Sequence, residues 1–378
     1  MTYPARRFLD HAAGSPVTGP VLAAMAAVWE LAGNPSSLHG SGRLVRRHLE
    51  QARESVAADL GAHPSEVVFC SGGTEANNLA VLGAAGPDGE VLASAVEHPS
   101  VSQAHRLLGE RLRVLQVDAE GRVDPAAIAA AITPTTRLVS VMWVNNETGV
   151  IQPVAEVAGV ARAAGVLSHS DAVQAAGHLE VDFAASGLDL LSVSGHKVGG
   201  PVGVGALLVR RGVTLGPAGF GGGQEARLRS GTVPAALAVG FAVALHSAVE
   251  RREAEAARLA VLGERLAAGI AAIPGTRVNT TPPASPAILN VTVDGTRADD
   301  LLLILDAAGI DCSTGSACTA GVHQPSEVLL AMGRDLAAAS GSLRFSFGPD
   351  TDDQAIDAVL AVLPQAVERA RLAYAGSP

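Results

Sequence analysis

Short apolar runs alternate with longer amphipathic segments through the first two thirds of the chain. The runs lie at Val67 to Cys70, Val91 to Val96, Leu112 to Val117, Leu138 to Val144, Val166 to His169, Leu188 to Val193 and Val204 to Val209. Continuous apolar runs of this length, bounded by Gly, Ser, Asp or Asn, are typical of buried strands in parallel sheets. The pattern therefore predicts an α/β fold in which a mainly parallel, seven-stranded sheet is covered by helices.

Segments with helical spacing precede and follow the predicted sheet, and the remaining part of the chain alternates strands and helices differently. Helices are expected around 17–31 and 42–60, and an Ala-rich helix runs from Val233 to about Ile273, where Pro274 and Gly275 end it. A strand at 288–293, a helix at 297–308, a strand at 343–347 and a closing helix follow. We expect a second, smaller α+β domain there, with the boundary within the long helix.

Composition narrows the class of protein. The 378 residues are 48% hydrophobic and 17% charged, which is globular, and the net charge of −10 disfavours direct binding to nucleic acid. The longest apolar stretch, Val233 to Leu245, is shorter than the roughly 18 residues of a membrane helix, and Met1 to Asp10 lacks the pattern of a signal peptide. Three cysteines imply no disulfide framework. We expect a soluble, cytoplasmic protein.

Nearly all of the basic residues are arginines. Of the 27 lysines and arginines, only Lys197 is a lysine. A lysine can lose its proton and act as a nucleophile when its pKa is lowered, whereas an arginine cannot. A single lysine in an ordinary ion pair is an equally good interpretation. The residues around Lys197 are therefore needed to distinguish a nucleophile from an ion-pair partner.

Polar residues follow several of the predicted strands, where the ligands of open α/β sheets bind. Small residues with free amides, Ser71 to Thr74, open a helix and suit a phosphate. The other strand ends carry Glu97 and His98, then Asn145 and Asn146, then Asp171 and Gln174, and finally Ser194, Gly195, His196 and Lys197. Each feature alone is commonly structural. Together they suit pyridoxal phosphate, which needs a lysine for a Schiff base and a carboxylate for its pyridine nitrogen.

The cysteines differ in their surroundings. Cys318 lies among small residues, from Ser313 to Gly321, that suggest an accessible loop in which a thiol could react. An inert loop cysteine is the alternative. Cys70, inside an apolar run, is expected to be a core residue, and Cys312 is expected to be structural. His323 does not add enough ligands to make Cys312 and Cys318 a zinc site.

These motifs resemble the cysteine desulfurases of the NifS/IscS type, pyridoxal-phosphate enzymes grouped with the class V aminotransferases. The resemblance runs through Phe8 to Ala13, Gly33 to Ser37, Ser194 to Lys197, Arg229 to Thr232, Ser313 to Cys318 and Arg344 to Ser346. It implies fold type I, with a large cofactor-binding domain at 14–258 and a small domain, made of 1–13 and 259–378, that carries the cysteine loop. The sequence departs from the family at Gly14 and Ser15, where threonines are usual, and at Pro349, where a basic residue is frequent.

The resemblance also implies roles for individual residues. Lys197 would form the Schiff base, Cys318 would carry sulfur, and His98 would stack on the cofactor ring and exchange protons. The cofactor would also be held by Gly73, Thr74, Asn146, Asp171, Gln174, Ser194, His196 and, from the partner subunit of a homodimer, Thr232. Arg344 would bind the substrate carboxylate, and Asn34 would approach the substrate.

The resulting hypothesis is a cysteine desulfurase that converts L-cysteine to L-alanine. Cys318 would hold the sulfur as a persulfide and pass it to an iron-sulfur scaffold protein or other acceptors, for iron-sulfur cluster assembly and tRNA thiolation. The resemblance leaves open a transient [2Fe-2S] cluster at Cys318, shared with the scaffold. A selenocysteine lyase or another class V aminotransferase is the first alternative. A non-enzymatic sulfur or iron-sulfur carrier, which would use Cys318 without Lys197, is the second.

Overall fold

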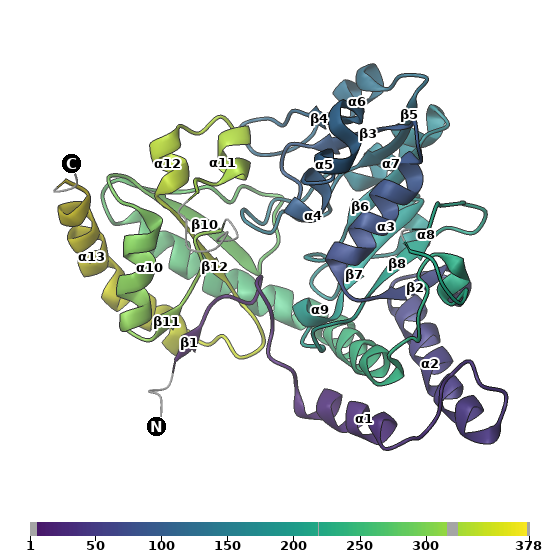
Figure 1. Ribbon diagram of the computed structural model, residues 1–378. Helices are drawn as coiled ribbons and strands as arrows, with labels where there is room; N and C mark the ends of the chain where they lie inside the picture. Colours follow the sequence, from purple (N-terminus) through teal and green to yellow (C-terminus); the bar gives the residue numbers. More distant parts are fainter. Residues whose placement is uncertain (1–5, 218, 316–323, 376–378) are drawn as a thin grey trace.

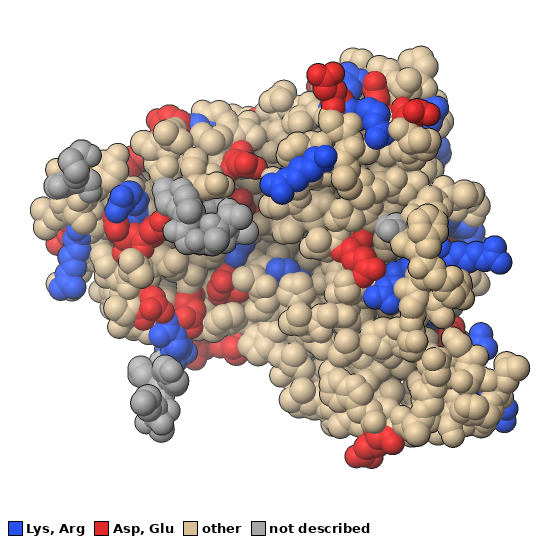
Figure 2. Space-filling view, in the orientation of Figure 1, with Lys and Arg blue, Asp and Glu red and all other residues tan. Residues whose placement is uncertain are grey.

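The computed structural model describes residues 6–217, 219–315 and 324–375. Two groups of elements surround separate hydrophobic cores, and a long helix, α9 (Ala235–Ala271), connects them (Figure 1). Among the described residues, no helix is long and apolar enough to cross a membrane. Basic and acidic side chains are interspersed on the face drawn in Figure 2.

A seven-stranded sheet forms the centre of the larger group, with the strand order β2-β8-β7-β6-β5-β3-β4. Its strands are β2 (Val67–Cys70), β3 (Glu90–Ser94), β4 (Leu112–Leu115), β5 (Thr136–Ser140), β6 (Leu167–Asp171), β7 (Leu190–Ser194) and β8 (Gly205–Val209). Strand β8 runs antiparallel to β2 and β7, and the other neighbours pair in parallel. The prediction of a mainly parallel, seven-stranded sheet is confirmed.

The strand ends differ from the prediction at the edge where ligands are expected. The run that was expected to be a strand to Val144 leaves the regular ladder after Ser140, although Trp143 still donates its N–H to the carbonyl of Asp171. Strand β6 continues to Asp171, two residues past the predicted end. Its polar residues are buried inside the sheet, which a reading based on apolar runs does not expect.

Helices cover both faces of the sheet because each presents an apolar stripe. In α2 (Gly40–Asp59), Val45, Leu49, Ala52 and Val56 are buried at helical spacing. The helix packs against α9, as does α1 (Gly19–Trp29). The other α-helices of this region are α3 (Gly73–Ala85), α4 (Pro99–Ser102), α5 (His105–Leu108), α6 (Pro125–Ala131), α7 (Val154–Ala163) and α8 (Phe183–Ser186).

The smaller group is built on a three-stranded antiparallel sheet with the order β12-β10-β9. It contains β9 (Thr276–Val278), β10 (Ile288–Val293), α10 (Ala298–Ala307), α11 (Glu327–Ala331), α12 (Leu336–Ser340), β12 (Ser342–Ser346) and α13 (Asp353–Ala375). A separate parallel pair joins β1 (Arg7–Phe8) to β11 (Ile310–Asp311). The N-terminal strand therefore packs beside residues that lie about 300 positions later in the chain.

Helix α9 contributes to both cores. Its first turns, with Phe241 and Leu245, belong to the core around the large sheet, and its last turns, with Leu259 and Ile270, belong to the core around β10 and β12. The division of the chain at residue 258 stays a prediction. The change of core along α9 occurs in the same stretch of the helix.

Candidate active site

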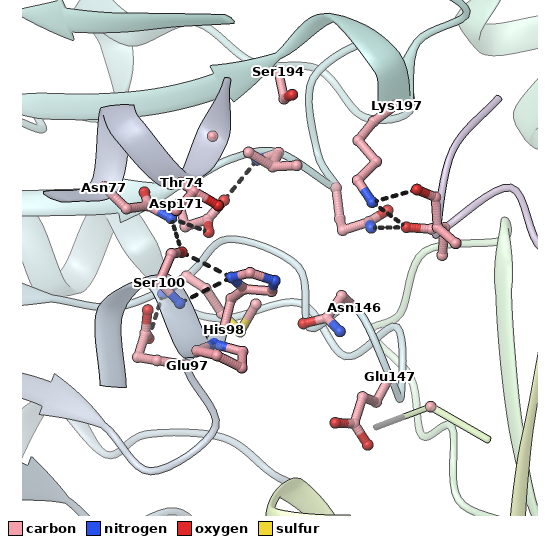
Figure 3. A pocket seen from close by; sticks show the side chains of 18 of the residues that line it. Thr74, Asn77, Glu97, His98, Ser100, Asn146, Glu147, Asp171, Ser194 and Lys197 are labelled. Atoms are coloured by element: carbon pink, nitrogen blue, oxygen red, sulfur yellow. Dashed lines mark hydrogen bonds between the residues drawn. The ribbon is translucent and has the colours of Figure 1, made fainter. Parts of the chain in front are cut away.

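A cavity of about 740 Å³ lies where the carboxyl ends of the large sheet face the smaller group of elements. Most of the predicted site residues line it: Gly73, Thr74, His98, Asn146, Asp171, Gln174, Ser194, His196, Lys197 and Arg344. In Figure 3, His98, Asn146, Asp171 and Lys197 surround one open space. The tertiary structure thus collects residues from six separate stretches of the sequence.

The start of α3 forms one wall of the cavity. Its first turn keeps N–H groups that have no partner inside the helix, and Gly72 before it offers no capping side chain. Gly72 has a φ of +151°, which favours glycine, and the Cβ of a residue in place of Gly73 would lie 2.7 Å from Cγ2 of Val173. Close beside this turn, Oγ of Ser194 lies 2.9 Å from Nδ1 of His196. The arrangement suits an anion, because amide donors, the helix dipole and two side chains converge.

Hydrogen bonds fix the orientation of His98. Its Nδ1 accepts from the backbone N–H of Ser100 at 3.1 Å and lies 2.7 Å from Oγ of Ser100. The ring therefore turns its other nitrogen away from the backbone (Figure 3). Burial lowers the pKa of His98, a trend that Asp171 opposes and Lys197 reinforces.

Asp171, at the end of β6, is held on both oxygens. Nδ2 of Asn77 donates to one oxygen at 2.6 Å, and the N–H of Val173 donates to the other at 2.9 Å. Asn77 lies on α3 and also donates to Oγ of Ser100. The same amide thus links the carboxylate to the residue that orients His98. Asn77 and Ser100 were not predicted from the sequence to be site residues, although Asn77 lies one helical turn after the predicted phosphate cradle.

Lys197 follows β7 and points into the cavity. Its Nζ donates to the carbonyl oxygens of Ala12 at 2.6 Å and Ala13 at 3.0 Å. Burial lowers the pKa of Lys197 to about 8, and the nearby charge of Arg344 adds to this effect. The amine is consequently much closer to neutrality at physiological pH than that of an ordinary lysine.

Arg344 lies in β12 with its guanidinium in the cavity wall. Nη2 donates to Oδ1 of Asp10 at 2.7 Å, and Nη1 donates to the carbonyl of Asn146 at 2.8 Å. Its Nε is buried and has no hydrogen-bond partner within the described residues. The side chain is thus oriented by two acceptors. The ion pair with Asp10 was not predicted from the sequence, although Asp10 lies within the motif Phe8 to Ala13.

Two buried carboxyl groups border the cavity. Glu97 accepts from Oγ of Ser94 and from the N–H of Met142, and burial raises its pKa to about 8. Glu147 accepts from Oγ of Ser326 at 2.5 Å, and burial raises its pKa as well. The sequence predicted that Glu97 lies at a strand end but indicated no role for it. Glu147 was not predicted to be a site residue. Nothing in the spacing of the residues signals their burial.

The structure does not bring every predicted residue to the cavity. Asn34 and Thr232 are exposed and lie outside the cavity lining. Cys318 lies outside the described residues, as does His323. Cys312 is buried in the cavity wall and burial raises its pKa to about 12, while Cys70 is buried in β2, as expected of a core residue.

The described residues fit pyridoxal phosphate. The uncapped first turn of α3, with Ser194 and His196 beside it, forms an anion cradle in the cavity wall. The same cavity is lined by a histidine ring, a carboxylate and an amine with lowered pKa, at His98, Asp171 and Lys197. These are the donors, acceptors and nucleophile that the cofactor requires.

Comparison with known proteins gives concordant matches. The family model described as Aminotransferase class-V matches residues 7–359. An IscS-like cysteine desulfurase of Mycobacterium tuberculosis is 49% identical, with 98% of this chain and 99% of that protein aligned. The X-ray structure of a NifS-like protein from Rickettsia africae superposes with a TM-score of 0.89 at 29% identity, covering 96% of this chain and 99% of that one. A structure described as SspA in complex with cysteine gives 0.79 at 34% identity, covering 91% and 99%.

Proposed function

The chain belongs to the class-V aminotransferase family and is a pyridoxal-phosphate-dependent cysteine desulfurase of the NifS/IscS type, and we propose that it converts L-cysteine to L-alanine with the sulfur carried as a persulfide on Cys318. The observation that carries the proposal is the position of Lys197, the sole lysine of the sequence. Its amine lies in one cavity with Arg344, Asp171 and the anion cradle at α3. The SspA structure contains cysteine, which is consistent with this substrate.

Several residues would hold the cofactor. Gly73, Thr74, Ser194 and His196 would bind its phosphate, Asp171 would pair with the pyridine nitrogen, and His98 would stack on the ring. Asn146 and Gln174 would bond to the ring substituents. When bound through Lys197, pyridoxal phosphate supplies an electron sink for the carbon next to the substrate carboxylate.

Arg344 would bind the substrate, and Lys197 would move its α proton. Arg344 lines the cavity and would bind the carboxylate of L-cysteine, which would fix the α carbon relative to Nζ of Lys197. Lys197 would take the α proton on Nζ, since its lowered pKa leaves an appreciable fraction of neutral amine. His98, with its Nδ1 already engaged by Ser100, would exchange protons through its other nitrogen.

Cys318 would then remove the sulfur. Its thiolate attacks the sulfur of the substrate, an S–S bond forms, and the bond between sulfur and the β carbon breaks. The bonding electron pair stays with the carbon skeleton, which takes up protons and leaves as L-alanine. A thiol reductant or an acceptor protein then takes the outer sulfur from the persulfide.

The proposal extends to partners. Iron-sulfur cluster assembly and tRNA thiolation would consume the sulfur, through a scaffold protein and other acceptors in the cytoplasm, and a transient [2Fe-2S] cluster at Cys318 would be shared with the scaffold. A homodimer would place Thr232, exposed on the isolated chain, at the phosphate of the partner subunit. Residues 14–258 would form the cofactor-binding domain, and 1–13 with 259–378 the small domain.

The test is to incubate the purified protein with L-cysteine and a thiol reductant, and to quantify alanine and sulfide together. Equal, time-dependent amounts of both establish desulfuration. If neither forms in a protein that holds pyridoxal phosphate, the function moves to an aminotransferase or a selenium-specific lyase. A protein that accepts sulfur without binding the cofactor is a carrier.

A further inference from the structure

Residues 10–15, called here the bridging segment, run between the two groups of elements. In Figure 1 the chain leaves β1, crosses the middle of the molecule and continues to α1. On one side the N–H of Ala12 donates to Oγ of Ser346 at 2.8 Å, next to β12 residues that form the small core. On the other side the N–H of Ser15 donates to the carbonyl of His196 at 2.8 Å. The segment is therefore bonded to both halves of the cavity.

The bridging segment holds the proposed substrate arginine through Asp10. The side chain of Arg344 is 6% exposed and that of Asp10 is 22% exposed, and their 2.7 Å ion pair is shielded from solvent. A buried guanidinium without a counter-charge would be costly, so the carboxylate both neutralises and orients it. Because Asp10 and the carbonyl of Asn146 engage Nη2 and Nη1, the orientation of the guanidinium is fixed.

The same segment holds the proposed catalytic lysine. Two residues after Asp10, the carbonyl of Ala12 accepts from Nζ of Lys197 and also from Nε2 of Gln174 at 2.8 Å. The carbonyl of Ala13 is a second acceptor for Nζ. Arg344 lies in β12 of the smaller group and Lys197 follows β7 of the larger group, and this short piece of chain contacts both side chains.

Asp10 and Arg344 also have opposite effects on the pKa of Lys197. Arg344 lowers the pKa of Lys197, whereas Asp10 and Asp171 raise it. His98 and His196 also face the amine, and the pKa of each is lowered, with Lys197 contributing to the shift. Removal of Asp10 should therefore lower the pKa of the lysine, and removal of Arg344 should raise it.

We propose that Asp10 is a positioning residue that fixes Arg344 relative to Lys197 for the carboxylate of the amino-acid substrate. The inference rests on the proposed function, since it assigns Arg344 to the substrate. Asp10 itself is not among the residues that line the cavity, so it reaches the substrate only through its contact with Arg344.

The experiment uses the full-length enzyme and the variants D10N, D10E and R344Q. D311N is the matched control, because Asp311 pairs with the exposed Arg6 and not with the site. Alanine formation from L-cysteine gives KM and kcat for the cofactor-loaded proteins. Labelling with [ε-¹³C]lysine gives one resonance, from Lys197, whose titration is followed by NMR after removal of the cofactor.

We expect D10N to raise KM by about tenfold or more with a smaller change in kcat, because a charge-assisted hydrogen bond to Arg344 is weakened. The Lys197 titration should move to lower pH in D10N and to higher pH in R344Q, and D311N should match the wild type. If D10N does not fold, D10E carries the test: KM rises because the carboxylate is displaced, and the titration moves less than in R344Q.

Two results would overturn the proposal. One is an unchanged KM in a folded D10N or D10E. The other is a Lys197 titration that moves in the same direction in D10N and R344Q, or in neither, which is what a merely structural role of Asp10 predicts. Failure of the proposed function is a separate result, because it appears as no alanine from the wild-type enzyme while the NMR titrations can still be compared.

Discussion

The Nζ atom of Lys197 lies 2.6 Å from the carbonyl oxygen of Ala12, so the only lysine of the chain is held by the backbone and not by a carboxylate. Carbonyl oxygens orient the amine, but they carry only a partial negative charge and so stabilise its protonated form less than a carboxylate would. Burial and Arg344 can then lower its pKa to about 8.

The proton-transfer step should require the neutral form of Lys197. Exchange of the α proton of L-alanine with D₂O tests this step without a substrate thiol, whose own titration would interfere. The exchange rate should rise as the pH rises through about 8 and then level off, because the amine loses its proton over that interval. The rate is measured by ¹H NMR. A rate that falls over the same interval would contradict the role of Lys197 as the base.

Lys197→Ala should lose both the lysine-bound cofactor and the α-proton exchange. The expected readout is loss of the visible absorbance of the lysine-bound cofactor, because no other lysine is present to replace it. Borohydride reduction of the wild type followed by peptide mass spectrometry should place the cofactor on the peptide that contains Lys197. An unchanged spectrum of the variant would refute the assignment.

Cys318→Ala should keep the cofactor spectrum and lose sulfide production. The thiolate is the proposed acceptor of sulfur, and alanine cannot replace it. Cys312→Ala is the matched control, since burial raises the pKa of Cys312 to about 12 and keeps it as an inert thiol. Full desulfurase turnover by the Cys318 variant, or equal losses in both variants, would remove Cys318 from the mechanism.

Glu97→Gln should alter how stability depends on pH. The pKa of Glu97 is about 8 in the folded chain against 4.5 for an ordinary glutamate, so between these values the folded state binds one more proton. The free energy of unfolding of the wild type should therefore fall, relative to that of the variant, by about 1.4 kcal/mol per pH unit as the pH rises. Urea unfolding at pH 5, 6 and 7 measures it.

The control for this comparison is Glu156→Gln, which replaces an exposed carboxylate on α7. Its pH dependence should follow that of the wild type. Parallel curves for the wild type and Glu97→Gln would show that Glu97 is ionised in the folded protein.

The sequence determined the architecture because local patterns are sufficient for it. Apolar runs bounded by small and polar residues predicted the strands of the large sheet, and their alternation with helical spacing predicted its parallel pairing. Strand boundaries were less accurate where burial did not follow hydrophobicity. Ser168 and His169 are polar and wholly buried in β6 because Asp189 bonds to Ser168, and Ser140 and Ser192 bond to His169, across the sheet.

The candidate site was predictable where residue types recur at strand ends, since parallel strands bring those ends together. Lys197, Asp171 and His98 were identified in this way, and the resemblance to the family added Arg344. The positions of these residues in one cavity agree with that reading. Their chemical roles stay predictions that the experiments above test.

Only the tertiary structure decided how these side chains are held. The bond from Asn77 to Asp171 spans 94 positions of the sequence, and the ion pair between Asp10 and Arg344 spans 334. No periodicity connects such pairs, because their proximity results from the packing of whole elements against one another. The same holds for the raised pKa of Glu97 and the lowered pKa of Lys197, which arise from loss of water around groups that the sequence alone shows only as charged.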